Sequence, residues 1–160
     1  MYAVLSALGR IRSGTGGERG SATVEMALVA PILIFLLFGI VDMGLLFRDT
    51  LVLGTACREA LRVACVGCST AEISSRAVSA AETLVTASIG VQMSYRQTPA
   101  DSWTTLSDTS DGTNSAPSGS QVRVTLAYPH TLIFGPIASM FGDNGSQTKT
   151  LHATMVARRE

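Results

Sequence analysis

Three cysteines are the most reactive side chains in this sequence, and two of them, Cys65 and Cys68, form a Cys-x-x-Cys pair. Such a pair can carry out thiol–disulfide exchange, but a thioredoxin-like site needs a strand–helix–strand setting. Here the pair follows a helical pattern, and Gly67 allows a turn between its members. We therefore expect a local disulfide that closes the helix end in an oxidising compartment, with a redox role as the alternative.

The third cysteine, Cys57, is a poor disulfide partner for Cys65. Eight residues of straight helix would separate the two by roughly 12 Å, which is beyond the reach of a disulfide. Since a free cysteine behaves as a small hydrophobic residue, we expect Cys57 to be buried in the core.

The other polar side chains do not form a catalytic or metal-binding pattern. The two histidines, His130 and His152, are expected in a surface turn and on the solvated face of a strand. Neither belongs to a Ser-His-Asp, metal or phosphate-loop arrangement. Asp108, Asp111 and Asn114 depart from the EF-hand spacing, and no Glu closes that loop. We therefore expect no enzymatic activity, no metal and no cofactor.

A peptide bond is the other candidate for chemistry. Gly20 and Ser21 precede Glu25 and a long apolar run, which is the pattern that prepilin peptidases read. Gly20 has no side chain, so its backbone can enter a protease cleft, and cleavage would free an ammonium group on Ser21. That amine, together with the free N–H groups and dipole of the first helical turn, can offset the carboxylate of Glu25 beside the hydrocarbon. The alternative is an uncleaved helix in which Glu25 is only a favourable first-turn acid.

The element that positions this bond is an apolar helix. No charge occurs from Met26 to Val41, and the apolar character continues to Phe47. About 22 helical residues cover roughly 33 Å, close to the hydrocarbon thickness of a bilayer. The sequence thus predicts a leader at 1–20 and a transmembrane anchor at 21–47, with a buried core helix as the alternative.

The charges around the anchor indicate its orientation. Arg10, Arg12 and Arg19 precede it against only Glu18, which favours a cytoplasmic amino terminus. The remaining residues, 48–160, are then expected to form one extracytoplasmic domain. The whole chain has 12 basic and 12 acidic residues, so its net charge offers no support for nucleic-acid binding.

The segment from Arg19 to Ala64 resembles the amino-terminal part of TadE-like proteins, the minor pseudopilins of tight-adherence (Flp pilus) systems. The residues that carry the resemblance are Arg19, Gly20, Val24, Glu25, Ala27, Leu28, Pro31, Gly39 to Gly44, Ala56, Arg58, Glu59, Ala60 and Arg62. Met26 departs from it, because these proteins usually carry an aromatic residue there. The resemblance implies processing by a prepilin peptidase and a role in assembling or initiating a Flp-type pilus or a related secretion apparatus. It also implies other pilins or pseudopilins and assembly-platform proteins as partners, in the cytoplasmic (inner) membrane or in the pilus itself.

Three residues of the anchor could shape its contacts with other helices. Pro31 should kink the helix or free a carbonyl, and Gly39 and Gly44 would allow another helix to approach closely. The two glycines do not form a GxxxG motif. Asp42 could pair with Arg48, but we expect it to reach the lipid headgroups instead.

The helical pattern continues beyond the anchor as an amphipathic segment. Its predicted buried stripe is Leu53, Ala56, Cys57, Ala60, Leu61 and Ala64. Ser69 and Glu72 read as a capping box that opens a second helix, which we expect to run to Gly90. Its predicted apolar positions are Ile73, Ala77, Ala80, Ala81, Leu84 and Val85.

The rest of the domain reads as a small antiparallel sheet. Alternation predicts strands over 91–95, 122–128 and 147–157, joined first by a long flexible loop at 98–120. The apolar segment 132–141 is too short to span a bilayer; we expect it to pack across the sheet, with shallow membrane contact as the alternative. Trp103 could cover the core or mark a contact surface.

Together these features predict an α+β, pilin-like fold, with a long transmembrane and amphipathic helix and a second helix packed on a small antiparallel sheet. The predicted function is that of a membrane-anchored pseudopilin. The alternatives are an anchored extracytoplasmic binding domain and, less favoured, a thiol oxidoreductase that uses Cys65 and Cys68. The sequence does not decide whether the subunit enters the fibre or stays in the membrane platform, and it gives no stoichiometry.

Overall fold

The computed structural model describes residues 16–135, 139 and 142–160. Its elements, in chain order, are α1 (Gly16–Val66), α2 (Thr70–Ala80), η1 (Thr86–Ser88), β1 (Gly90–Arg96), β2 (Thr104–Thr105), β3 (Gln121–Thr131), η2 (Asp143–Gly145) and β4 (Thr148–Arg158). A long apolar first helix, a second helix and a four-stranded antiparallel sheet confirm the predicted α+β class. The chain divides into two compact units, residues 1–38 and residues 39–160.

The first unit contains, in its described part, only the beginning of α1. The large apolar side chains from Val24 to Phe38 are exposed. Within the described residues, α1 is the one helix long and apolar enough to cross a membrane. Because exposed leucine, isoleucine and phenylalanine are unfavourable in water, this segment is suited to a lipid environment and is a candidate membrane span, consistent with membrane anchoring.

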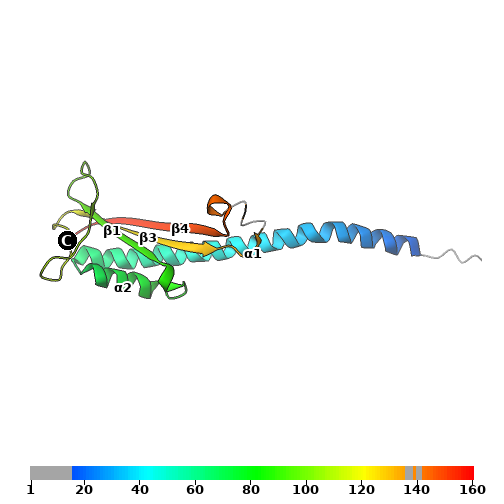
Figure 1. Cartoon of the computed structure of the whole chain (residues 1–160), viewed down its shortest axis with the longest axis horizontal. Helices are drawn as coiled ribbons and strands as arrows, with labels where there is room; N and C mark the ends of the chain where they lie inside the picture. Colours follow the sequence, from blue (N-terminus) through cyan, green and yellow to red (C-terminus); the bar gives the residue numbers. More distant parts are fainter. Residues whose placement is uncertain (1–15, 136–138, 140–141) are drawn as a thin grey trace, which may run out of the picture. The chain divides into compact units, whose positions relative to one another are not determined.

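The second unit is built on the remainder of α1. All six residues of the predicted stripe, from Leu53 to Ala64, are buried. They pack with Ile73 and Ala77 of α2 and with the inner face of the sheet in one hydrophobic core. Figure 1 shows α2 and strands β1, β3 and β4 beside this part of α1. The spacing of three and four residues therefore predicted the core face of α1 correctly.

The second helix begins as predicted and ends early. The Ser69 hydroxyl accepts the N–H of Glu72, and the Glu72 carboxylate accepts the N–H of Ser69, so both halves of the capping box are present. The helix stops at Ala80, however, and not at Gly90. The β-branched residues Thr83, Val85 and Thr86 follow closely and lower the helix propensity of that stretch.

The sheet has the strand order β2-β1-β3-β4, and every neighbouring pair is antiparallel. Along β3 the side chains of Val122, Val124 and Leu126 are completely buried, whereas the residues between them are half-buried. The observed β1 and β3 extend the predicted strands by one to three residues at their ends, and β4 begins and ends one residue later than predicted. Period-two alternation therefore identified the strands and the face that each turns to the helices.

Residues 98–120, predicted as a flexible loop, carry structure of their own. Strand β2 pairs with β1 through Thr105 and Ser94, and Asp108 bridges to Asn114. Leu106 and Ala116 are buried, which fastens the segment to the core. The prediction was incomplete because the polar composition of the segment outweighed these two apolar residues.

Candidate functional site

The predicted processing bond lies in the first turns of α1. The helix begins at Gly16, so the bond between Gly20 and Ser21 is helical, and the side chains of Ser21 and Glu25 are exposed. Four residues separate these two side chains, which places them on the same side of the helix, one turn apart. A peptidase could reach the bond only by unwinding this turn. Residues 1–15 of the predicted leader lie outside the described residues.

The predicted packing residues of the anchor all lie on α1, and their contacts with another helix stay a prediction. Pro31 lies inside α1 and is exposed, and Gly39 is half-buried. At Gly44, a Cβ atom would meet no other atom within 4 Å. Nothing within the described chain therefore requires glycine at this position, and its small size is free to serve contacts with another molecule.

Asp42 is buried inside the protein, with only 2% of its surface exposed. Its two carboxylate oxygens accept the backbone N–H groups of Ile133 at 3.2 Å and Phe134 at 3.0 Å. This corrects the prediction that Asp42 reaches the lipid headgroups. Ile133 and Phe134 follow β3, which ends at Thr131, and the carboxylate accepts the N–H groups of both.

Asp49 lies seven residues further along α1 and forms a second polar contact with the same part of the chain. Its Oδ2 atom is 2.8 Å from Nδ1 of His130, and both side chains are nearly buried, with 12% and 7% exposed. The prediction that His130 occupies a surface turn is therefore wrong. The Nε2 atom of His130 is buried and has no hydrogen-bond partner among the described residues.

Sequence reasoning missed both contacts because it treated the acidic residues of α1 as surface groups. A usable signal was present, because Asp42 and Asp49 stand seven residues apart and continue the stripe of Leu53, Ala56 and Ala60 at spacings of three and four. Positions separated by seven lie on the same helix face. Carboxylates on a core-facing stripe require buried donors, but the sequence alone does not identify them.

The end of α1 is closed by Asn114 from the polar loop. Its amide nitrogen donates to the carbonyl oxygens of Ala64 and Cys68, each at 3.0 Å, and its backbone N–H donates to Gly67. The guanidinium of Arg159 in turn donates to the side-chain oxygen of Asn114 at 3.0 Å. Asn114 thus acts as a tertiary cap at the end of α1, where the Ala64 carbonyl also accepts the N–H of Gly67.

All three cysteines are free thiols in the structure. Cys57 is fully buried, as predicted, and burial raises the pKa of its thiol. Burial and the nearby charge of Glu160 also raise the pKa of Cys65. The local disulfide between Cys65 and Cys68 stays a prediction. Within the described residues, no group of three or more His, Cys, Asp or Glu is placed to hold a metal ion.

Trp103 lies on the outer face of the sheet. The guanidinium groups of Arg96 and Arg123 lie 4.5 Å and 4.2 Å from its ring centre, so two cations contact one aromatic ring. Next to them is a hollow of about 480 Å³, lined in part by Ser94 and Thr125. The tryptophan therefore marks a surface cluster and does not cover the core between sheet and helices.

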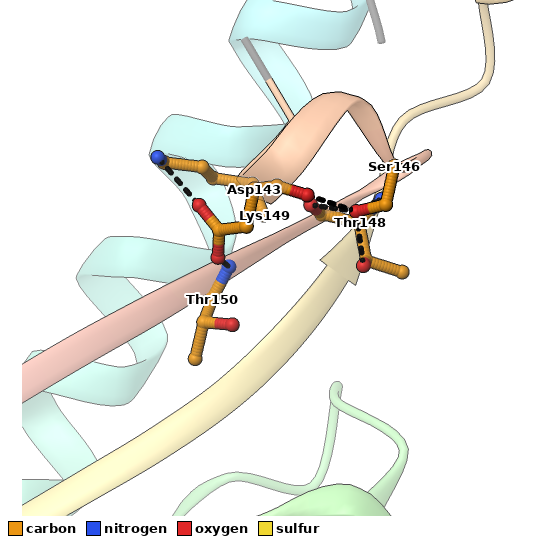
Figure 2. Close-up of polar contacts among 5 residues, drawn as sticks. All are labelled: Asp143, Ser146, Thr148, Lys149 and Thr150. Atoms are coloured by element: carbon orange, nitrogen blue, oxygen red, sulfur yellow. Dashed lines mark hydrogen bonds and ion pairs between the residues drawn. The ribbon is translucent and has the colours of Figure 1, made fainter. Parts of the chain in front are cut away.

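The turn before β4 is held by the carboxylate of Asp143 (Figure 2). It accepts the Nζ group of Lys149 at 2.7 Å and the backbone N–H of Thr150 at 2.8 Å. Ser146 closes the turn by donating its hydroxyl to the Asp143 carbonyl at 2.6 Å. The hydrogen bonds to the carboxylate, first that from Lys149 and then that from Thr150, lower the pKa of Asp143 to about 2.

This depressed pKa predicts a loss of stability in acid. A carboxylate whose pKa is lower in the folded state stabilises the fold above its unfolded pKa, and this contribution disappears as the pH falls through the folded pKa. For Asp143 that window runs from 3.8 down to about 2. Urea unfolding of the detergent-solubilised full chain should show a steeper loss between pH 4 and 2 for the wild type than for Asp143→Asn. Lys149→Met should reduce the difference, and identical pH profiles for wild type and Asp143→Asn would contradict the assignment.

A comparison with known protein families gives a match to part of the first helix. The family described as TadE-like protein matches residues 20–62, which confirms the resemblance predicted from the sequence. The matched segment contains Gly20, Glu25, Pro31, Asp42 and Asp49, and it ends before the Cys-x-x-Cys pair. No curated protein and no solved structure matches the chain.

Proposed function

We propose that this chain is a membrane-anchored pseudopilin of a Tad/Flp pilus system, cut by a prepilin peptidase between Gly20 and Ser21. The observation that carries the proposal is the coincidence of three features in one segment. The Gly-Ser bond, the acid at Glu25 and the exposed apolar helix all fall at the start of the region that matches TadE-like proteins. The family match indicates a role in a Tad/Flp pilus system.

Charge supports an orientation with the amino terminus in the cytoplasm and residues 48–160 outside. Arg10, Arg12 and Arg19 precede the apolar helix, and positive residues are retained on the cytoplasmic side of a membrane. The leader would then meet a peptidase at the cytoplasmic surface of the inner membrane. After cleavage, the new amine of Ser21 would lie one helical turn from Glu25 and offset its charge beside the lipid.

The proposed role is that of an assembly component and not of an enzyme. A redox Cys-x-x-Cys needs a thiol of lowered pKa, because the thiolate is the attacking species. The pKa of Cys65 is instead raised by burial and by Glu160, which disfavours nucleophilic attack at neutral pH. The partners proposed for this role are other pilins or pseudopilins and the assembly platform.

The proposal is tested by the mass of the protein extracted from membranes. Coexpression with a prepilin peptidase should remove residues 1–20 and leave Ser21 as the new amino terminus. Gly20→Glu should abolish this shortening, because a side chain at the cleavage position blocks entry of the backbone into the protease cleft. Gly17→Glu is the matched control, since it makes the same change three residues upstream and should still be cut.

Two results would contradict the proposal. One is an unshortened chain in the presence of an active peptidase that cuts a known substrate in the same cells. The other is cleavage of Gly20→Glu at an unchanged position, which would show that Gly20 is not read.

A further inference from the structure

We infer that the segment directly after β3, at Ile133 and Phe134, is a second membrane contact that rests in the lipid beside α1. The carboxylate of Asp42 holds this segment against the helix by accepting the backbone N–H groups of Ile133 and Phe134. The inference rests on the membrane anchoring of α1 and does not depend on cleavage at Gly20 or on a role in a pilus.

The position of Asp42 along the helix sets the level of this contact. Five residues separate Asp42 from Phe47, where the apolar run ends, which corresponds to roughly 7.5 Å along the axis. Counted from Met26, a hydrocarbon core of about 30 Å extends for about 20 helical residues, to Leu45. Asp42 therefore lies inside the hydrocarbon region, three residues before its end at Leu45.

A carboxylate at that level is unfavourable in lipid unless it is paired or hydrated. The structure offsets this cost by covering Asp42 with the segment that follows β3, so that only 2% of the residue is exposed. Because the backbone N–H groups of Ile133 and Phe134 bind this carboxylate, the two residues must lie at the same depth in the bilayer as Asp42.

The side chains around this level are those expected in contact with lipid. Ile133 is 68% exposed, and Ile40, Val41 and Phe47 of α1 are exposed as well. The adjoining sequence contains no charge from Thr131 to Gly142. The free energy falls when an exposed isoleucine next to a membrane helix enters the boundary between headgroups and acyl chains.

Charged side chains occur at the next positions along α1 and the sheet, on the side away from the anchor. Asp49 contacts His130, and His130 is paired in register with Lys149, which binds Asp143. Arg48 is exposed in the same turn of α1 as Asp49. Along α1, the exposed apolar residues Ile40 and Val41 thus precede the turn that carries Arg48 and Asp49, as at the end of a membrane span, and Leu51 beyond this turn is exposed as well. Since the apolar side continues directly into the anchor, lipid is the partner that the arrangement fits.

The test places a single tryptophan at chosen positions of the full chain in liposomes whose lipids carry bromine on the upper acyl chain. The background is Trp103→Phe, which removes the one native tryptophan and keeps an aromatic ring between the two arginines. Ile133→Trp should be quenched about twofold more strongly than Val156→Trp, because insertion reaches roughly 5–10 Å into the interface. Val156 is the matched control, since it is an exposed aliphatic residue of the outer sheet face.

Leu36 lies ten helical residues from Met26, near the middle of the hydrocarbon, so Leu36→Trp is measured in matched liposomes whose lipids carry bromine near the ends of the acyl chains, and it reports whether the chain is inserted at all. Quenching of Leu36→Trp together with Ile133→Trp supports the second contact. If Leu36→Trp is quenched while Ile133→Trp behaves like Val156→Trp, the second contact is overturned and the anchor and the proposed function stand. A blue-shifted but unquenched Ile133→Trp would show that protein covers this segment and would also overturn the inference. If Leu36→Trp is unquenched, membrane anchoring itself fails.

Discussion

Replacing Asp49 with leucine should lower the free energy of unfolding by about 3 kcal/mol, because it leaves His130 buried without a partner at either ring nitrogen. Leucine branches at Cγ as aspartate does and is larger, so the change removes the hydrogen bond without opening a cavity. His130→Leu should have a comparable effect, because it leaves a nearly buried carboxylate unpaired. Denaturant unfolding of the detergent-solubilised full chain, followed by circular dichroism, measures both changes.

The double variant separates the contact from its surroundings. When both polar partners are replaced by apolar groups, no buried donor or acceptor is left unsatisfied, so Asp49→Leu with His130→Leu should be less destabilised than the sum of the two single variants. Asp49→Asn, which keeps an oxygen to accept the Nδ1 proton, should fall between the wild type and Asp49→Leu. Strictly additive losses would show that the two side chains act independently.

Asn114→Ala should destabilise the chain by about 2–3 kcal/mol, because the carbonyl groups of Ala64 and Cys68 and the guanidinium of Arg159 each lose a partner at once. Asn114→Asp should not restore stability. It keeps the oxygen that Arg159 contacts but turns a second acceptor toward two carbonyl oxygens. The same denaturant experiment reads out both variants.

Ser118→Ala provides the matched control for Asn114→Ala. It changes an exposed polar residue of the same loop and should stay within about 0.5 kcal/mol of the wild type. If Asn114→Ala were as mild as Ser118→Ala, the loop would not be capping α1. Proteolysis would provide a second readout, because the end of α1 should become more susceptible in Asn114→Ala than in Ser118→Ala.

The features that the sequence predicted correctly depend on neighbours along the chain. The stripe from Leu53 to Ala64, the capping box of Ser69 and Glu72, and the alternation of β3 each repeat within a few residues, and each has a physical reason that acts locally. The family resemblance belongs to the same group, because all of its residues fall within one continuous helix.

The features that the sequence did not predict join residues that are far apart. Asp49 and His130 are separated by 81 positions, Asp42 and Ile133 by 91, and Asn114 and Ala64 by 50. Each contact pairs a polar side chain with a donor or acceptor whose position is set only when the sheet has packed on α1. Composition alone makes such residues look solvated, which is why His130 was predicted in a surface turn and Asn114 in a flexible loop.

Strand β4 gives the contact of Asp143 a further meaning. It is the last strand of the sheet in the described chain, and open strand edges promote aggregation when molecules are crowded in one membrane. Thr150 stands opposite Pro129, which has no N–H, and donates its own N–H to Asp143. The charged side chain of Asp143 therefore accepts a backbone N–H near the start of β4, so this N–H cannot bind a strand of another molecule, which opposes edge-to-edge pairing of sheets.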